Sequence, residues 1–143
     1  MKIDLEQITK ENIALYSDFE TADIKEYQSR IYPDKNADAK LWYYIKFNDL
    51  YIGSVWLEKS PKDDYAVLGI FIANECYRNK GIGSNVIEIM LGKLQMFSVD
   101  KVLLRVRESN KRAIKCYEKV GFIENRRYVK ENGIKVIEML YER

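Results

Sequence analysis

The sequence contains no histidine, and this absence excludes more kinds of chemistry than any other feature of its composition. Histidine is the commonest general base, a member of the serine and cysteine catalytic triads, and a frequent zinc ligand. The two cysteines, Cys76 and Cys116, are too few for a disulfide scaffold and lack the spacing of a metal site. We therefore expect two reduced thiols in an intracellular protein that has no metal site.

A strong charge of one sign and long apolar runs are also missing. Lys and Arg total 24, and Asp and Glu total 22, so the net charge is +2. A general nucleic-acid-binding protein needs a concentrated basic face. No apolar run approaches the length of a membrane span, and residues 1–6 carry charges unlike those of a signal peptide. We therefore predict a cytoplasmic protein that binds neither nucleic acid nor a membrane.

The order of the periodic segments predicts a mixed α/β fold. The length suits one domain, and no repeat or linker divides the chain, so we expect a single domain over residues 1–143. Alternating apolar residues predict strands, and apolar residues three or four positions apart predict helices. The predicted segments are strands at 2–8, 41–47, 51–57, 65–73, 101–107, 122–129 and 134–141, and helices at 10–20, 24–31, 81–97 and 110–120. Their order indicates a central, mostly antiparallel twisted sheet of about seven strands flanked by about four helices.

One junction between a strand and a helix suggests a phosphate site. The apolar strand at 65–73 leads into a loop with two glycines, Gly81 and Gly83, and then into an amphipathic helix. The start of a helix presents unpaired N–H groups and a partial positive charge, and glycine allows a ligand to approach the backbone. Arg78 and Lys80 add formal charge. The segment is either a cradle for a diphosphate or a basic surface turn.

Two established phosphate motifs do not match this junction. The third glycine of a dinucleotide fingerprint is absent, because Val86 stands at its position. No Gly-Lys-Ser/Thr follows the first glycine at the spacing of a nucleotide-triphosphate loop. A different kind of phosphate ligand is therefore indicated.

A second motif follows about thirty residues downstream and gives the chain a family resemblance. It reads Asn110-x-x-Ala113-x-x-x-Tyr117-x-Lys119-x-Gly121-Phe122, and it comes after Arg78-x-x-Gly81-x-Gly83. With the two motifs in this order, the sequence resembles the GNAT superfamily of N-acetyltransferases, closely over residues 65–125 and elsewhere by element order. The resemblance implies that acetyl-coenzyme A is the cofactor and that its acetyl group passes directly to a primary amine in a ternary complex.

The resemblance also implies roles for individual residues. Asn110 would contact the cofactor, and Tyr117 would donate a proton to the departing sulfur of coenzyme A. The backbone of the strand end would pair with the pantetheine arm, and the backbone amides of the glycine loop would hold the pyrophosphate. The strand-end residues are Phe71, Ile72 and Ala73, and the loop residues are Arg78, Asn79, Lys80, Gly81, Ile82, Gly83 and Ser84.

Simpler structural roles remain open for the residues of the second motif. Tyr117 lies on the apolar stripe of its helix, and this position equally suits a core aromatic with a solvated hydroxyl. Asn110 also suits a helix N-cap. Cys116 has no histidine or other evident base beside it, so we expect no acyl-cysteine intermediate.

The sequence offers no clear general base. An amine with a pKa near 10.4 is mostly protonated at pH 7, and deprotonating it costs about 4–5 kcal/mol. Residues 65–68 lack the glutamate that many family members carry there, and Arg105 stands where the family's ribosomal-protein alanine acetyltransferases have glutamate. Glu58 and Glu108 are the remaining candidates, and both also suit solvated surface charges. Arg105 either binds an acidic group on the acceptor or is a surface arginine.

Three functions are therefore open. The first is acetylation of a small-molecule amine such as a polyamine, an amino acid or an aminoglycoside-like compound. The second is acetylation of a protein lysine or N-terminus, and the third is a non-catalytic acyl-CoA-binding sensor module, which the missing base favours. An exposed edge in the terminal hairpin makes a homodimer possible. We also expect several aromatic residues on the acceptor side, either as core packing or as the lining of a pocket for a cationic amine. They are Tyr27, Tyr32, Trp42, Tyr43, Tyr44 and Trp56.

Overall fold

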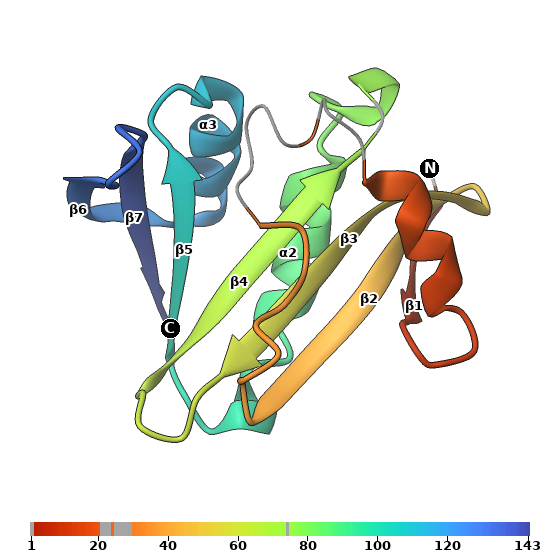
Figure 1. Cartoon of the computed structure of the whole chain (residues 1–143), viewed down its shortest axis with the longest axis horizontal. Coiled ribbons are helices and arrows are strands. Elements are labelled where there is room, and N and C mark those ends of the chain that lie inside the picture. The colour runs from red at the N-terminus through yellow and green to blue at the C-terminus, as the bar shows by residue number, and fades with distance from the viewer. Residues whose placement is uncertain (1, 21–23, 25–29, 74) are drawn as a thin grey trace.

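Seven strands form one twisted sheet in the order β1-β2-β3-β4-β5-β7-β6 (Figure 1). The computed structural model describes residues 2–20, 24, 30–73 and 75–143. The strands are β1 (Ile3–Gln7), β2 (Ala39–Phe47), β3 (Leu50–Lys59), β4 (Tyr65–Ile72), β5 (Lys101–Arg107), β6 (Ile123–Val129) and β7 (Lys135–Glu142). All neighbouring pairs are antiparallel except β4 and β5, which confirms the predicted, mostly antiparallel sheet.

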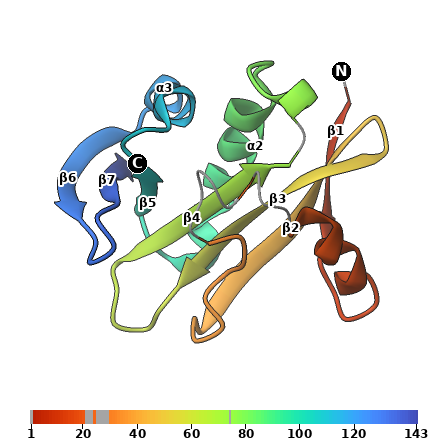
Figure 2. The same ribbon diagram turned by 45° about the horizontal axis from the view of Figure 1, so that its top comes forward.

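The parallel pairing of β4 with β5 is short. It joins residues 65–67 of β4 to residues 101–103 of β5, and beyond this point the two strands separate. Figure 2 shows β5, β6, β7 and α3 on one side of the resulting opening and β1 to β4 on the other. The second half of β4 therefore has a free edge in the middle of the sheet.

Helices cover one face of the sheet, and an aromatic cluster covers the other. The described residues include the α-helices α2 (Ile82–Leu91) and α3 (Lys111–Val120) and the 3-10 helices η1 (Ile13–Phe19), η2 (Glu75–Tyr77) and η3 (Leu94–Phe97). On the first face, α2 packs its apolar side on the aliphatic residues of β3, β4 and β5. On the second face the buried cluster consists of Tyr16, Phe19, Ile24, Ile31, Tyr44, Trp56 and Phe71, beneath η1.

Two predicted helices differ from the observed ones. The helix expected at 10–20 is the shorter 3-10 helix η1, because the Asn12 side chain accepts the Thr9 N–H and donates to the Gln7 carbonyl, so a turn forms first. The helix expected at 81–97 ends at Leu91, where the Lys93 N–H bonds the Met90 carbonyl three residues back and tightens the chain toward η3. The helix predicted at 24–31 lies largely outside the described residues.

The C-terminal elements follow the sequence prediction. Helix α3 ends at Gly121, which has a φ of +119° and donates its N–H to the carbonyls of Tyr117 and Glu118. Strands β6 and β7 form the expected hairpin, and β2 alternates as expected, with Tyr43 and Ile45 on the α2 side and Tyr44 on the other.

A glycine in β4 makes room for the largest side chain of the core. A Cβ atom on Gly69 would lie 2.1 Å from ring atoms of the buried Trp56 on β3. The indole therefore lies directly over the strand. Its N–H donates to a Glu58 carboxylate oxygen at 3.3 Å.

Replacing Gly69 with alanine is expected to lower the free energy of unfolding by about 2–3 kcal/mol, since the Trp56 ring would have to move away from the strand. Gly133→Ala is the control, because a Cβ atom there meets nothing within 4 Å. Alanine at position 133 should still lower the free energy of unfolding by about 1 kcal/mol, because the residue there has a φ of +84°. Chemical denaturation measures both values, and equal losses would contradict the proposed packing contact.

Candidate active site

A cavity of about 560 Å³ occupies the opening between β4 and α3; we call it the groove. It is bounded by the end of β4, the loop before α2, the first turns of α2 and one side of α3. Its lining residues are Ile70, Phe71, Ile72, Tyr77, Arg78, Asn79, Gly81, Gly83, Ser84, Ile87, Asn110, Lys111, Arg112, Ala113, Lys115, Cys116, Tyr117 and Lys119. The separation of β4 from β5 thus brings both sequence motifs to one cavity.

The edge of β4 presents backbone groups to the groove that no described strand pairs. Ala73 donates its N–H to the Ile52 carbonyl of β3 at 2.7 Å, and the register between β3 and β4 is regular. Polar groups alternate in an antiparallel pair, so Phe71 also directs its N–H and C=O toward β3. Ile70 and Ile72 therefore direct theirs away from β3, toward the groove. An extended ligand can pair with such an edge as an added strand does.

Arg78 fixes the end of this strand. Its Nε donates to the Ile72 carbonyl at 2.9 Å, and its Nη2 donates to the Ala73 carbonyl at 3.3 Å. The side chain is 7% exposed, and its Nη1 lies 3.8 Å from a Glu75 carboxylate oxygen. The guanidinium therefore holds the shape of the loop from within, whereas the sequence analysis had assigned its charge to the ligand.

The first turn of α2 supplies backbone donors. The first helical bond runs from the Asn85 N–H to the Gly81 carbonyl, so the three preceding amides have no acceptor within the helix. Gly81 is the N-cap with a φ of +78°, it has no capping side chain, and a Cβ atom there would meet nothing within 4 Å. The turn is therefore open on the side where an anion would bind.

The two glycines of the loop have different structural roles. Gly81 has a positive φ, which glycine adopts without a steric penalty. Gly83 belongs to helix α2, and a Cβ atom on it would lie 3.4 Å from the Cys116 Sγ of α3. Gly83 therefore lies where α2 meets α3, and a methyl group there would make ordinary van der Waals contact with Cys116.

Helix α3 contributes a polar start and a row of cations. The Asn110 side chain accepts the Ala113 N–H at 3.3 Å, so the N-cap role is confirmed, and the same residue lines the groove. Four exposed cations on α3 also line the groove. They are Lys111, Arg112, Lys115 and Lys119. Phosphate groups would meet a positive potential along this wall.

Tyr117 lies between the groove and a second cavity. It is half-buried on α3, and its ring stands edge-on to Phe122 with the ring centroids 6.2 Å apart. Burial raises the pKa of its hydroxyl well above the ordinary value. Tyr117 therefore stays protonated at neutral pH and can donate a hydrogen bond or a proton into either cavity.

The second cavity, of about 180 Å³, lies on the other face of the sheet between β4 and β5; we call it the middle cavity. It shares Ile70, Asn110 and Tyr117 with the groove. Its remaining walls come from Trp56 on β3, the centres of β4 and β5, and the β6–β7 hairpin. A ligand there and a ligand in the groove would both reach Tyr117.

The two carboxylates considered as a general base lie away from this junction. Glu58 is 4% exposed, so its interpretation as a solvated surface charge is wrong. It accepts hydrogen bonds from the Arg30 guanidinium, the Asp34 N–H and the Trp56 indole. Glu108 pairs with Arg127 at 3.7 Å and lines neither the groove nor the middle cavity.

The structure gathers most of the predicted site residues around the groove. The predicted residues that line it are Phe71, Ile72, Arg78, Asn79, Gly81, Gly83, Ser84, Asn110 and Tyr117. Three do not line it: Ala73 is paired with β3, Lys80 is exposed, and Ile82 is buried in the core. Ile70 and three cations of α3 line the groove without a signal in the sequence, because Lys111, Arg112 and Lys115 lie six, five and two positions before Tyr117 and so off its helical stripe.

The aromatic residues predicted for the acceptor side mostly belong to the core. Trp56 lines the middle cavity, whereas Trp42 and Tyr44 pack beneath η1 and Tyr43 packs on the opposite face of the sheet. Tyr32 donates to a Glu20 carboxylate oxygen outside the site. Tyr27 lies outside the described residues.

Neither a metal site nor a membrane span appears among the residues that the structure describes. No group of three or more Cys, Asp or Glu side chains there is arranged to hold a metal ion. No helix in that part of the chain is both long and apolar enough to cross a bilayer.

Short stretches of the sequence match acetyltransferases of known function. A stretch of 60 residues is 32% identical to N-alpha-acetyltransferase 30 of Saccharomyces cerevisiae, covering 42% of this chain and 34% of the relative. A stretch of 81 residues is 30% identical to the mycothiol acetyltransferase of Corynebacterium efficiens, covering 57% of this chain and 27% of that enzyme. These matches span about a third or less of each relative's length.

Solved structures of acetyltransferases share the whole fold. An aminoglycoside acetyltransferase in complex with coenzyme A superimposes with a TM-score of 0.80 at 20% identity, over 99% of this chain and 95% of that chain. A spermidine N-acetyltransferase from Vibrio cholerae, in complex with CoA and spermine, gives 0.81 at 18% identity, over 98% and 95%. The model of the acetyltransferase (GNAT) family matches residues 6–122, most of the chain. This protein therefore belongs to the GNAT family of acetyltransferases.

Proposed function

We propose that this protein is an N-acetyltransferase that moves an acetyl group from acetyl-coenzyme A to the primary amine of a small acceptor. The observation that carries the proposal is the location of Tyr117 at the boundary of two cavities. One cavity has the donors that the pantetheine arm and the pyrophosphate of coenzyme A need, and the other is small and lies against the sheet. The proposal assigns the groove to the cofactor and the middle cavity to the acceptor.

The groove fits coenzyme A at both ends. The backbone amides of Ile82, Gly83 and Ser84 lie at the open N-cap of α2 and can donate hydrogen bonds to the pyrophosphate. The cations of α3 can pair with the negative charge of the phosphate groups that these amides do not bind. The N–H and C=O of Ile70 and the N–H of Ile72, which no described strand pairs, suit the amides of the pantetheine arm, while the Ile72 carbonyl already accepts from Arg78. When bound, acetyl-coenzyme A supplies the acetyl group as an activated thioester.

Tyr117 is the proposed acid. Transfer of the acetyl group leaves a thiolate, and a tyrosine that stays protonated at neutral pH can donate a hydrogen bond to it, although the raised pKa makes this tyrosine a weaker proton donor. Direct transfer is favoured over an acyl-enzyme because burial raises the pKa of the Cys116 thiol, and the nearest polar partner of that thiol is the Ser84 hydroxyl at 3.8 Å. Cys116 is therefore a poor nucleophile.

The charge of the middle cavity helps to deprotonate the acceptor. None of the described residues that line the middle cavity is Asp or Glu, whereas Arg105, Arg107 and Lys130 line it. Neighbouring positive charges disfavour an ammonium ion and lower its pKa, by about 1–3 units when they are close. A lowered pKa would reduce the cost of forming the neutral amine, whose proton would pass to water.

The same lack of a carboxylate supports a second candidate, a module that binds acyl-coenzyme A without turnover. The groove would bind acyl-coenzyme A equally well in such a module, and only Tyr117 would then have no role. Acetylation of a protein amine stays an alternative, because a cavity of about 180 Å³ could admit the amine-bearing end of either kind of acceptor. A homodimer through the exposed hairpin strand β6 stays a prediction.

Tyr117→Phe is expected to lower kcat about 10- to 100-fold, because the leaving thiolate loses its donor, and to change the Kd for coenzyme A less than twofold. A thiol-release assay with acetyl-coenzyme A and a panel of amines measures the rate. Tyr51→Phe is the matched control, since its hydroxyl donates to Glu6 at 2.9 Å on the exposed β1 side of the sheet. Normal turnover of Tyr117→Phe would disprove the donor role, and no turnover by the unaltered protein with any amine would favour the module.

Coenzyme A is expected to protect Cys116 from alkylation. In a Cys76→Ser variant, iodoacetamide should react slowly with Cys116 near pH 8 and faster at higher pH, because a raised pKa leaves less thiolate. Saturating coenzyme A should slow this reaction at least fivefold, since Cys116 lines the groove. In a Cys116→Ser variant, the exposed Cys76 should react at the same rate with and without coenzyme A. Equal rates for Cys116 with and without coenzyme A would place the ligand elsewhere.

A further inference from the structure

The groove has a cationic wall on one side of α3. Four exposed cations of this helix line the groove, and none of the described lining residues is Asp or Glu. Arg78 also lines it, but this guanidinium is bonded to the carbonyls of Ile72 and Ala73 and lies near Glu75. The positive charge that a ligand would meet therefore comes mainly from α3. The four cations, which we call the α3 row, are Lys111, Arg112, Lys115 and Lys119.

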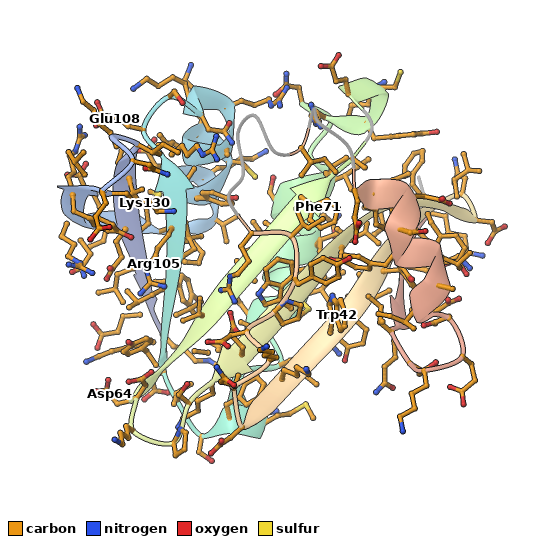
Figure 3. The ribbon with its side chains drawn as sticks, in the orientation of Figure 1. Trp42, Asp64, Phe71, Arg105, Glu108 and Lys130 are labelled. Carbon is orange, nitrogen blue, oxygen red and sulfur yellow. The ribbon has the colours of Figure 1, made fainter. Side chains whose placement is uncertain are left out.

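No described carboxylate is paired with the α3 row. The ion pairs of the described residues join other side chains, and Glu118, the one acidic residue of α3, does not line the groove. Glu108 precedes the helix and pairs with Arg127 at 3.7 Å. Figure 3 shows Glu108 on the side of the opening that holds the β6–β7 hairpin, and Phe71 across the opening on β4. The row therefore presents uncompensated positive charge to the groove.

The arrangement of these cations lowers the stability of the helix that carries them. Lys111 and Arg112 lie in the first turn of α3, which has no acidic residue, so both lie at the positive end of the helix dipole. Lys115 lies four residues after Lys111 and four before Lys119, and like charges at this spacing repel each other. A helix selected for stability alone would have acidic residues in its first turn. Such departures from local rules are expected where a ligand binds.

The order of side chains around α3 locates the row relative to the open amides of α2. The Cys116 Sγ lies 3.8 Å from a serine hydroxyl in the first turn of α2, so this cysteine marks the level of those amides. With about 3.6 residues per turn, Arg112 and Lys119 lie beside Cys116 on the side away from Tyr117, and Lys115 lies further round in the same direction. A ligand that runs from Tyr117 past the first turn of α2 therefore meets these three cations next.

We infer that Arg112, Lys115 and Lys119 bind the 3′-phosphate of coenzyme A and make the protein selective for the complete cofactor over 3′-dephospho-coenzyme A. This inference rests on the proposed function, which assigns the β4 edge to the pantetheine arm and the first turn of α2 to the pyrophosphate. The 3′-phosphate is the anionic group of the cofactor that lies beyond the pyrophosphate. Lysine and arginine bind such a group by charge-assisted hydrogen bonds.

The pyrophosphate alone leaves much of the row without a counter-charge. It carries about one negative charge per phosphorus atom, and the amides and dipole of α2 already stabilise that charge. The 3′-phosphate is a monoester and adds about 1.5 to 2 negative charges near pH 7. The whole cofactor therefore matches the four cations of the row, whereas dephospho-coenzyme A does not.

The inference is tested by calorimetric titration of the full chain with coenzyme A and with 3′-dephospho-coenzyme A. The Kd for the dephospho form should be at least about 10-fold higher, because the hydrogen bonds between the phosphate and the cations are lost. Raising the salt concentration from about 0.05 M to about 0.5 M should reduce this ratio, since the row is exposed and salt screens it. Equal Kd values at low salt overturn the inference and leave the acetyltransferase function in place.

Variants identify the residues responsible. The triple variant Arg112→Gln, Lys115→Gln and Lys119→Gln should bring the ratio of the two Kd values below about twofold, and each single variant should lower it about threefold. The ratio is the readout, because a cation that only neighbours the pyrophosphate would weaken both ligands equally. Lys62→Gln is the control, since it removes the same charge from an exposed turn before β4, at the end of the strand away from the groove. An unchanged ratio in the triple variant overturns the inference.

Stability separates ligand binding from a structural role. Without ligand, the triple variant should unfold at a denaturant concentration no lower than the unaltered chain, because repulsion within α3 is relieved. A lower midpoint, together with an equal loss of affinity for both ligands, would assign these side chains to the fold and overturn the inference.

The binding ratio also separates this inference from the catalytic proposal. If no amine is acetylated but the unaltered chain prefers coenzyme A and the triple variant does not, the phosphate site stands and the catalytic proposal fails. If an amine is acetylated, acetyl-3′-dephospho-coenzyme A should raise the KM for the donor at least about 10-fold and change kcat less than about twofold, because the lost contacts are remote from the reacting atoms. No binding of either form of the cofactor overturns both proposals.

Discussion

The site depends on one constraint, the early separation of β4 from β5. Three residue pairs join these strands, and after them the sheet opens. Strand β4 is held on its other side by β3 along most of its length, so its free edge stays straight and available. An unpaired edge is usually a liability at the rim of a sheet, yet here it lies between two halves of one domain. The opening therefore provides a strand-like partner for an extended ligand.

Several contacts hold this opening in shape. Arg78 ties the carbonyls at the end of β4 to the loop before α2, and the close approach of Gly83 to Cys116 seats α2 against α3. Tyr117 is thereby positioned at the wall shared by the groove and the middle cavity. The groove, the position of Tyr117 and the middle cavity are thus consequences of the same packing arrangement.

The sequence predicted the order of the elements along the chain and the two motifs, because these depend on local patterns. Alternation located the strands, and the two motifs located the start of α2 and the helix α3, both of which line the groove. Other features depend on contacts between distant segments. The ion pair between Glu58 and Arg30 and the basic lining around Arg105 form only when β3, β5 and the β6–β7 hairpin come together. Residue spacing within one segment contains no signal for them.

Amide hydrogen exchange of the full chain, with and without coenzyme A, tests the central claim most directly. If the cofactor adds to the free edge of β4 and binds the first turn of α2, exchange should slow at Ile70 and Ile72 and at residues 82–84. Amides already bonded to β3, such as that of Ala73, should change little. Binding of coenzyme A that leaves the β4 edge and the start of α2 unprotected would contradict this account.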